Sequence, residues 1–276
     1  MSALAKGLYI VSTPIGNLED ISLRAVRILE KSDFILCEDT RHSLKLLNHY
    51  KIKNNLISYH KFNEKKSLKK IIEYLNQGKI LSLISDAGTP ALSDPGNLII
   101  NECIKKNHPI FTVPGASSIT SAVSLSGFED KFLFYGFLPK KENELNKSLK
   151  KLKNIEFSLV FFIPSLKINF YLKMFKKFFS GRKIFIAREM TKKYESYYSS
   201  KIDNIENFKS ALKGELTVIL SKRIDTKKLT TDFNNIEKQI IRYLKSYKVK
   251  DVVELISKKE EVPKKIIYNL CLKHKK

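Results

Sequence analysis

The sequence predicts an α/β fold of two α/β domains followed by a small C-terminal helical tail. Three observations predict it. Strand-like apolar runs alternate with helix-like segments as far as about residue 220, glycine and proline cluster where those runs end, and residues 231–276 show helical spacing alone. A chain of 276 residues is about right for two domains, and its 43% hydrophobic residues suffice for packed cores. We place the boundaries at 1–128, 129–230 and 231–276.

The first domain is expected to contain a mostly parallel sheet, because short loops join its strands to intervening helices. The predicted strands are Leu8–Thr13, Phe34–Cys37, Ile80–Ser85 and Ile110–Val113. The predicted helices are Ile21–Lys31, Asn63–Asn76, Asn97–Lys106 and Ser117–Leu125.

The second domain is expected to be richer in strands. They are predicted at Phe132–Phe137, Ser158–Ile163, Lys183–Arg188 and Leu216–Leu220, with helices at Pro139–Lys153 and Leu166–Phe178. The tail suggests helices at Asn234–Ser246, Val249–Ser257 and Pro263–His274, since proline suits a first helical turn. Two interpretations of the tail remain open, a helix-turn-helix-like unit and a packing appendage with solvated lysines.

The basic residues are unevenly distributed. The net charge is +23, but residues 1–130 hold 16 basic and 13 acidic residues, whereas 131–276 hold 35 and 15. An AT-rich genome would explain part of this, because 44 lysines stand against 7 arginines. The asymmetry favours a polyanionic partner for the second half, and nucleic acid in particular.

Several protein classes are excluded by absent patterns. The three cysteines lie far apart without a C-x-x-C pair, which argues against a zinc ribbon or disulfide framework and for a reducing cytoplasm. The sequence contains no cluster of cysteine and histidine residues that would indicate a metal site. No run of 18 apolar residues could span a membrane, and no apolar signal-peptide core follows the N-terminus. No G-x-G occurs, which removes the Rossmann fingerprint and the Walker loop.

Glycine and proline cluster in four turns that follow predicted strands: 14–17, 86–90, 94–96 and 114–118. Any one of them alone is most simply an ordinary turn. Together they suggest a ligand site, because ligands of open α/β sheets bind beyond the carboxyl ends of the strands. Asp86 could accept hydrogen bonds from a ligand or cap its own loop, and Ser117 and Ser118 could bind a ligand as well as cap a helix.

These turns belong to an ordered set of motifs that resembles the tetrapyrrole methylase superfamily. The opening motif is Leu8–Leu18 (LYIVSTPIGNL). Further motifs resemble, more narrowly, the ribosomal RNA small subunit methyltransferase family: EDTRH at 38–42, ISDAGTP at 84–90, VPGASS at 113–118, FYGFLP at 134–139, AREMTKKYE at 187–195 and KGE at 213–215. The resemblance covers residues 7–220 in order, and the helical tail also fits it.

The resemblance implies S-adenosylmethionine as methyl donor, bound in a cleft between the two domains. It also implies 2′-O-methylation of a cytidine ribose in the decoding region of 16S rRNA, with the RNA inside the 30S subunit, and it implies a homodimer. The cofactor-binding residues carried over from the family are Pro14, Asp86, Gly88, Pro90, Leu92, Ser117, Ser118, Phe162, Ala187 and Thr217.

One segment departs from the family pattern. Relatives usually carry an aromatic residue followed by E-S/A-P-H-R, whereas this chain has FIPSLK at 162–167. Lys167 could supply a charge there, although it lacks the bidentate geometry of arginine.

Methyl transfer to a ribose hydroxyl requires alignment and a proton acceptor, but neither a metal nor a covalent enzyme intermediate. Glu38, Asp39 and Arg41 form a dense charged group after a buried-looking strand. We expect Glu38 or Asp39 to act as base or to orient the ribose and Arg41 to hold a phosphate. The alternative is an internal salt bridge that fixes the loop, and His42 is a second possible base.

In the second domain we expect Arg188, Glu189, Lys192 and Lys193 to contact RNA or to position a loop. Lysines at 140–153, 173–177 and 245–276 would add affinity that does not depend on sequence. Two other functions remain open: a methylase of a small tetrapyrrole-like molecule or a modified protein residue, and a non-catalytic RNA- or ribosome-binding relative.

Overall fold

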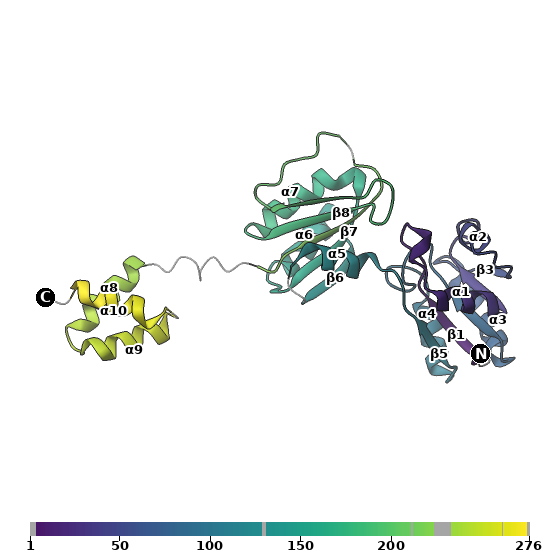
Figure 1. Cartoon of the computed structure of the whole chain (residues 1–276), viewed down its shortest axis with the longest axis horizontal. Coiled ribbons are helices and arrows are strands. Elements are labelled where there is room, and N and C mark those ends of the chain that lie inside the picture. Colours follow the sequence, from purple (N-terminus) through teal and green to yellow (C-terminus); the bar gives the residue numbers. More distant parts are fainter. Residues whose placement is uncertain (1–3, 129–130, 211, 224–232, 261, 275–276) are drawn as a thin grey trace. The chain divides into compact units, whose positions relative to one another are not determined.

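The computed structural model describes residues 4–128, 131–210, 212–223, 233–260 and 262–274. The described residues up to Arg223 form one compact unit, and those from Phe233 onward form a second. The first unit contains two five-stranded sheets and the second contains only helices (Figure 1). The predicted α/β class with C-terminal helices is therefore confirmed.

The first sheet is parallel throughout, as the alternation of strands and helices predicted. Its strands are β1 (Gly7–Val11), β2 (Phe34–Cys37), β3 (Leu56–Ser58), β4 (Ile80–Leu83) and β5 (Ile110–Val113), in the order β3-β2-β4-β1-β5. Strand β3 was not predicted, because three residues are too few to show a period of two.

Helices cover both faces of this sheet because successive strand residues point to opposite sides. Tyr9 and Val11 of β1 pack with α1 (Leu23–Lys31) and α2 (Thr40–His49). Leu8 of the same strand packs with α3 (Glu64–Asn76) and α4 (Asn97–Lys105). Helix α2 was not predicted either, because its buried side includes the hydroxyl of Ser43 and so lacks a continuous apolar stripe.

The second sheet is mixed. Its strands are β6 (Phe132–Phe137), β7 (Ser158–Pro164), β8 (Lys183–Arg188), β9 (Ser196–Lys201) and β10 (Glu215–Leu220), in the order β6-β7-β10-β8-β9. Only the β6–β7 pair is parallel. The polar edge strand β9, with sequence SYYSSK, was not predicted, because it lacks the alternation of a half-buried strand.

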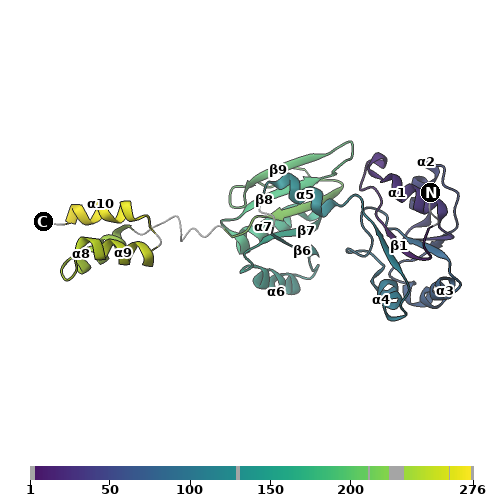
Figure 2. The same cartoon turned by 60° about the horizontal axis from the view of Figure 1, so that its bottom comes forward.

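Helices also cover both faces of the second sheet (Figure 2). Helices α6 (Glu142–Leu152) and α7 (Ile168–Phe179) enclose the largest apolar core on one face. Helix α5 (Ser118–Ser126) lies on the other, where Ile119 and Ala122 pack with Val160 and Ile219. Although the sequence analysis placed this helix before the domain boundary at 128, its apolar side chains pack against the second sheet.

The C-terminal unit contains α8 (Phe233–Leu244), α9 (Val249–Lys259) and α10 (Lys264–His274), within a few residues of the predicted helices. Its own apolar core includes Ile240, Val252, Ile256, Ile267 and Cys271. None of the helices in the described part of the chain combines the length and the apolarity needed to cross a membrane.

Candidate active site

The loops that follow β1 and β4 are joined at the carboxyl edge of the first sheet. The amide of Thr13 donates to the carbonyl of Gly88 at 2.9 Å, and the amide of Gly88 donates back at 3.1 Å. The Thr13 hydroxyl also donates to the carbonyl of Ser85 at 3.1 Å, and the hydroxyls of Ser12 and Thr89 lie 3.0 Å apart. These bonds fix two of the predicted ligand-binding turns against each other.

Backbone conformation shapes the loop after β4 as well. Gly88 has a φ of +80°, and a Cβ there would lie 3.3 Å from Ile15. Ala91 and Ser93 adopt positive φ angles of 64° and 73°, which residues other than glycine adopt only at an energetic cost. The two strained residues lie on the loop that presents Asp94.

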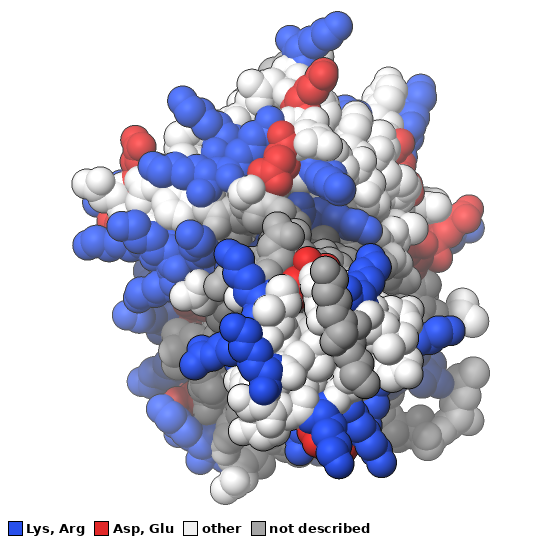
Figure 3. Space-filling model, turned by 90° about the vertical axis from the view of Figure 1, so that its left-hand side faces the viewer, with Lys and Arg blue, Asp and Glu red and all other residues white. Residues whose placement is uncertain are grey.

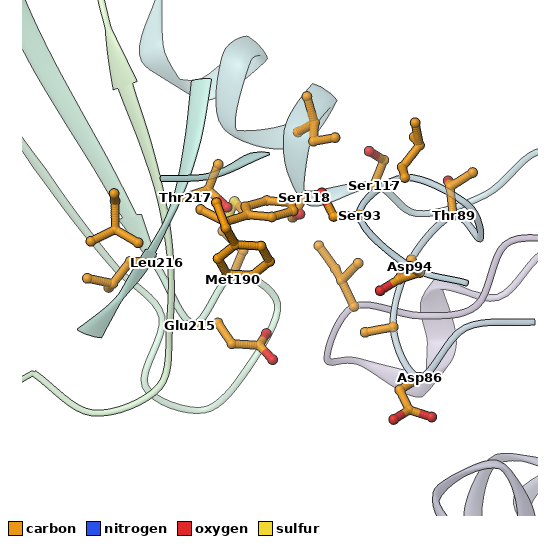
Figure 4. A pocket seen from close by; sticks show the side chains of 18 of the residues that line it. Asp86, Thr89, Ser93, Asp94, Ser117, Ser118, Met190, Glu215, Leu216 and Thr217 are labelled. Carbon is orange, nitrogen blue, oxygen red and sulfur yellow. The ribbon is translucent and has the colours of Figure 1, made fainter. Parts of the chain in front are cut away.

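A cavity of about 440 Å³ lies beside these loops, a volume within the range of roughly 300–1,000 Å³ that is usual for small-molecule sites (Figure 4). Its lining comes from the first-sheet loops, the start of α5, β7, β10 and the residues around Met190. Seven of the ten residues expected to bind the cofactor line it: Asp86, Gly88, Leu92, Ser117, Ser118, Phe162 and Thr217. The other three, Pro14, Pro90 and Ala187, are buried and do not line it.

The charged residues of this lining are all acidic: Glu38, Asp86, Asp94 and Glu215. Burial raises the pKa of Asp94 to about 6, and the charges of Glu38 and Asp86 add to the shift, while a hydrogen bond from Ser85 opposes it. Burial, followed by the charge of Asp86, also raises the pKa of Glu38. The cavity therefore favours a cationic ligand and holds carboxylates whose proton affinity is increased.

The three residues of the predicted catalytic group occupy different environments. Glu38 lines the cavity, whereas Asp39 and Arg41 do not. Asp39 caps α2 through the amide of Arg41 at 2.9 Å, and the Arg41 Nη2 donates to the same carboxylate at 2.8 Å. The hydrogen bonds from the Arg41 side chain hold the pKa of Asp39 well below its usual range. This is the geometry of the salt-bridge alternative, and His42 is exposed on the same helix.

The first turn of α5 provides unused polar groups. Ser117 occupies the N-cap position, but its side chain makes no capping hydrogen bond, contrary to the simple capping role that sequence reasoning allowed. The hydroxyls of Ser117 and Ser118 thus lie at the cavity wall together with the amides that begin a helix. Such a helix start favours negatively charged groups and hydrogen-bond acceptors.

The residues predicted to contact RNA in the second domain largely pair with one another. Lys192 donates to Glu189 at 3.0 Å and to Glu215 at 2.9 Å, and Glu189 also accepts from the Glu215 amide. The Arg188 Nε donates to the Lys213 carbonyl at 2.8 Å. Lys193 differs from them, because it is exposed and lies over the ring of Tyr194.

The same segment contacts the turn after β1. The Asn17 amide donates to the Thr191 hydroxyl at 3.0 Å, and a Cβ at Gly16 would lie 2.5 Å from the Lys192 side chain. The paired charges of residues 188–192 therefore shape a loop beside the cavity, and this arrangement matches the loop-positioning alternative of the sequence analysis.

Several residues that line the cavity had no predicted role. Asp94 was noted only as part of a turn, and Phe137, Met190 and Glu215 lay inside recognised motifs without an assigned role. The altered segment contributes Phe162, Ile163 and Pro164 to the lining, whereas Leu166 is 75% exposed. No group of three His, Cys, Asp or Glu residues in the described ranges is placed to hold a metal ion.

Comparisons with known proteins agree on one family. The family model of the tetrapyrrole (corrin/porphyrin) methylases matches residues 7–206. The ribosomal RNA small subunit methyltransferase I of Rickettsia prowazekii is 41% identical over 278 residues, covering 99% of this chain and 98% of its own length. The protein of the same name from Mesomycoplasma conjunctivae is 47% identical over 219 residues, covering 79% of this chain and 92% of the relative.

Solved structures share the fold at low sequence identity. Diphthine synthase has a TM-score of 0.61 at 13% identity and covers 78% of this chain and 89% of its own. The uroporphyrin-III C-methyltransferase of Thermus thermophilus, complexed with S-adenosylhomocysteine, has a TM-score of 0.56 at 14% identity, with 78% and 97% covered. By the family match and the relatives together, this chain belongs to the tetrapyrrole methylases and, among them, to the ribosomal RNA small subunit methyltransferase I family of S-adenosylmethionine-dependent methyltransferases.

Proposed function

We propose that this chain transfers the methyl group of S-adenosylmethionine to the ribose 2′-hydroxyl of a cytidine in 16S rRNA. The observation that carries the proposal is an acidic cavity in a chain of net charge +23. A cationic sulfonium donor suits carboxylate walls, whereas a polyanionic acceptor suits the basic remainder of the surface. The proteins that resemble this chain along its whole length are named for methylation of the same RNA.

The residues present fit this cofactor, which supplies an already activated methyl group. Ile15, Leu92, Phe137 and Phe162 give the cavity apolar walls for an adenosyl group. Ser117 and Ser118 would bind the amino-acid carboxylate, because their hydroxyls and the helix start provide donors. Glu38, Asp86 and Asp94 line the same cavity, and their negative charge would hold the sulfonium and ammonium groups.

We assign the proton-accepting role to Asp94 and Glu38. Figure 4 shows the Asp94 carboxylate directed from its loop toward the residues of the second sheet, whereas Asp86 lies farther along the wall. A carboxylate whose pKa is raised accepts a proton from a ribose hydroxyl more readily than an ordinary one. The role that the sequence analysis gave to Glu38 or Asp39 thus moves to the two carboxylates that line the cavity.

The phosphates would contact Arg41 and the exposed lysines. Asp39 holds the Arg41 guanidinium in a bidentate pair, yet the Arg41 side chain remains 88% exposed. Lys193 and Tyr194 add an exposed cation and an exposed ring in the second domain. Among the charged side chains visible in Figure 3, lysine and arginine cover more of the surface than aspartate and glutamate do. Arg188, Glu189 and Lys192 act in this proposal by holding the loop that carries Lys193.

We also retain the domain boundaries at 128 and 230, a homodimer and a cytoplasmic location as proposals. Light scattering after size exclusion tests the dimer directly, and a monomeric mass at micromolar concentration would reject it.

The decisive experiment is transfer of labelled methyl from S-adenosylmethionine to 30S subunits that lack the modification. Naked 16S rRNA and a porphyrinogen serve as parallel acceptors. Label in an alkali-stable, nuclease-resistant dinucleotide is the expected result, because 2′-O-methylation blocks cleavage at that ribose. Label in the porphyrinogen would support a small-molecule methylase instead. Cofactor binding without transfer to any acceptor would support a non-catalytic relative.

A further inference from the structure

Phe62 stands out among the exposed apolar residues. It lies in the segment between β3 and α3, and its side chain is 94% exposed, the largest value among the large hydrophobic residues that the structure describes. Its ring forms an edge-type contact with the imidazole of His60, at a centroid distance of 6.0 Å. One face of the phenylalanine ring is therefore available for stacking.

The backbone that carries this ring is held by a dense set of hydrogen bonds. Asn63 accepts from the His60 amide at 2.8 Å and donates to the Ser58 carbonyl at 3.0 Å. The Phe62 amide donates to the His60 Nδ1 at 3.2 Å, and the amides of Asn63 and Glu64 donate to the His60 carbonyl. The segment is thus a fixed support, which lowers the entropic cost of binding through the ring.

This support lies next to the cavity. Strands β2 and β3 are neighbours with Cys37 opposite Ser58, and the Tyr59 amide donates to the Cys37 carbonyl at 2.8 Å. The register places Glu38, which lines the cavity, beside the segment that begins with Tyr59.

Lysines are concentrated in the sequence next to Phe62, in an otherwise balanced half of the chain. Residues 61–70 carry five lysines and one glutamate, whereas residues 1–130 as a whole hold 16 basic and 13 acidic residues. Lys61, Lys65 and Lys66 are exposed. An exposed aromatic ring among lysines matches the chemistry of single-stranded nucleic acid, in which bases stack and phosphates contact cations.

We propose that Phe62 is a stacking platform for an unpaired base of the RNA substrate, next to the nucleotide whose ribose is methylated. Lys61, Lys65 and Lys66 would contact the adjoining phosphates. The inference rests on the proposed function, since it assumes an RNA acceptor at this cavity. It adds a residue that fixes the position of the RNA strand without taking part in the chemistry.

The test compares full-length Phe62→Ala, Phe62→Leu and Phe62→Trp variants with the wild type on unmodified 30S subunits. Because stacking on one aromatic ring changes binding by roughly 5- to 150-fold, kcat/KM should fall within that range for alanine, mainly through KM. Leucine should not restore it, whereas tryptophan should. The melting temperature and the dissociation constant for S-adenosylmethionine should stay at wild-type values. Leu23→Ala, which removes another apolar side chain that is 91% exposed, is the matched control.

Three results would overturn the proposal that Phe62 stacks on a base of the RNA. Wild-type KM in Phe62→Ala would show that the ring contacts no RNA. Full activity of Phe62→Leu would indicate a non-aromatic apolar contact, and a change of oligomeric mass in Phe62→Ala would assign the ring to a contact between protein copies. Failure of the proposed function is distinguishable, because the wild type would then label no RNA at all.

Discussion

Replacement of Asp94 by asparagine should stabilise the folded protein at neutral pH while it slows methyl transfer. In the folded state burial raises the pKa of this carboxyl from 3.8 to about 6, with further contributions from Glu38 and Asp86. At pH 7.5 the carboxylate is ionised in an environment that disfavours its charge. The neutral amide of Asp94→Asn removes that cost but cannot accept a proton from a ribose hydroxyl.

The pKa difference sets the magnitude. About two pKa units correspond to roughly 3 kcal/mol in the free energy of unfolding, which solvent screening of this partly buried group reduces to about 1–2 kcal/mol. Because the folded-state pKa is the higher one, the folded protein binds the proton more tightly. The wild type therefore loses this stability as the pH rises from about 4 to about 6. Asp94→Asn should gain stability above pH 6 and almost none near pH 4.

Urea denaturation at pH 7.5 and pH 4.5, together with single-turnover transfer to 30S subunits, measures both effects. Asp203→Asn is the control of opposite sign. The Gly181 amide donates to the Asp203 carboxylate at 2.8 Å, and this hydrogen bond is the main cause of the lowered pKa of that carboxyl. Asp203→Asn should therefore lower the free energy of unfolding at pH 7.5. An equal effect of Asp94→Asn at both pH values, or an unchanged transfer rate, would refute the reasoning.

Four further outcomes are expected. Arg182 is 1% exposed and donates to the carbonyls of Phe157 and Ser221, so Arg182→Leu should lower the free energy of unfolding by about 3 kcal/mol; a loss under 1 kcal/mol in urea denaturation would contradict this. Gly88→Ala should cost roughly 1–2 kcal/mol, because alanine disfavours a φ of +80°, and it should weaken cofactor binding in calorimetry. Glu38→Gln should weaken binding of S-adenosylmethionine about tenfold. It should change binding of S-adenosylhomocysteine less than about twofold, because the product lacks the sulfonium charge. An equal loss of affinity for both compounds would show that the Glu38 carboxylate does not act on the sulfonium charge. RNA affinity should fall by roughly 0.7 log units per log unit of salt for each phosphate neutralised, so a flat response in filter binding would mean that the excess lysines contact no RNA.

The elements that were predicted correctly share a physical cause. Apolar residues that recur with a period of two or 3.6 mark a buried face, which is why β2 and β5 have their predicted bounds and α3 begins one residue later than expected. Where burial is weak or interrupted the pattern fails. The three residues of β3, the hydroxyl of Ser43 in α2 and the polar strand β9 gave no such signal.

The residues of the candidate site also fall into two groups, those whose place in the sequence predicted the site and those for which it gave no signal. Asp86, Gly88 and Ser117 follow strands whose carboxyl ends meet at one edge, so their position in the sequence already predicted a shared site. Asp94 and Glu215 were not assigned, because nothing local distinguishes a carboxylate in a cavity wall from one in a surface turn. Neighbours distant in the sequence make that difference.

The sequence by itself determined the α/β class, the family and most of the turns that line the cavity, because strand periodicity and turn chemistry are local properties of the chain. Only the tertiary structure separated Glu38, which lines the cavity, from Asp39 and Arg41, which pair with each other. It also brought Glu215 and Asp94 to the same cavity and left the ring of Phe62 exposed. Burial and charge pairing depend on which distant segments meet, and that is decided by packing rather than by the order of residues.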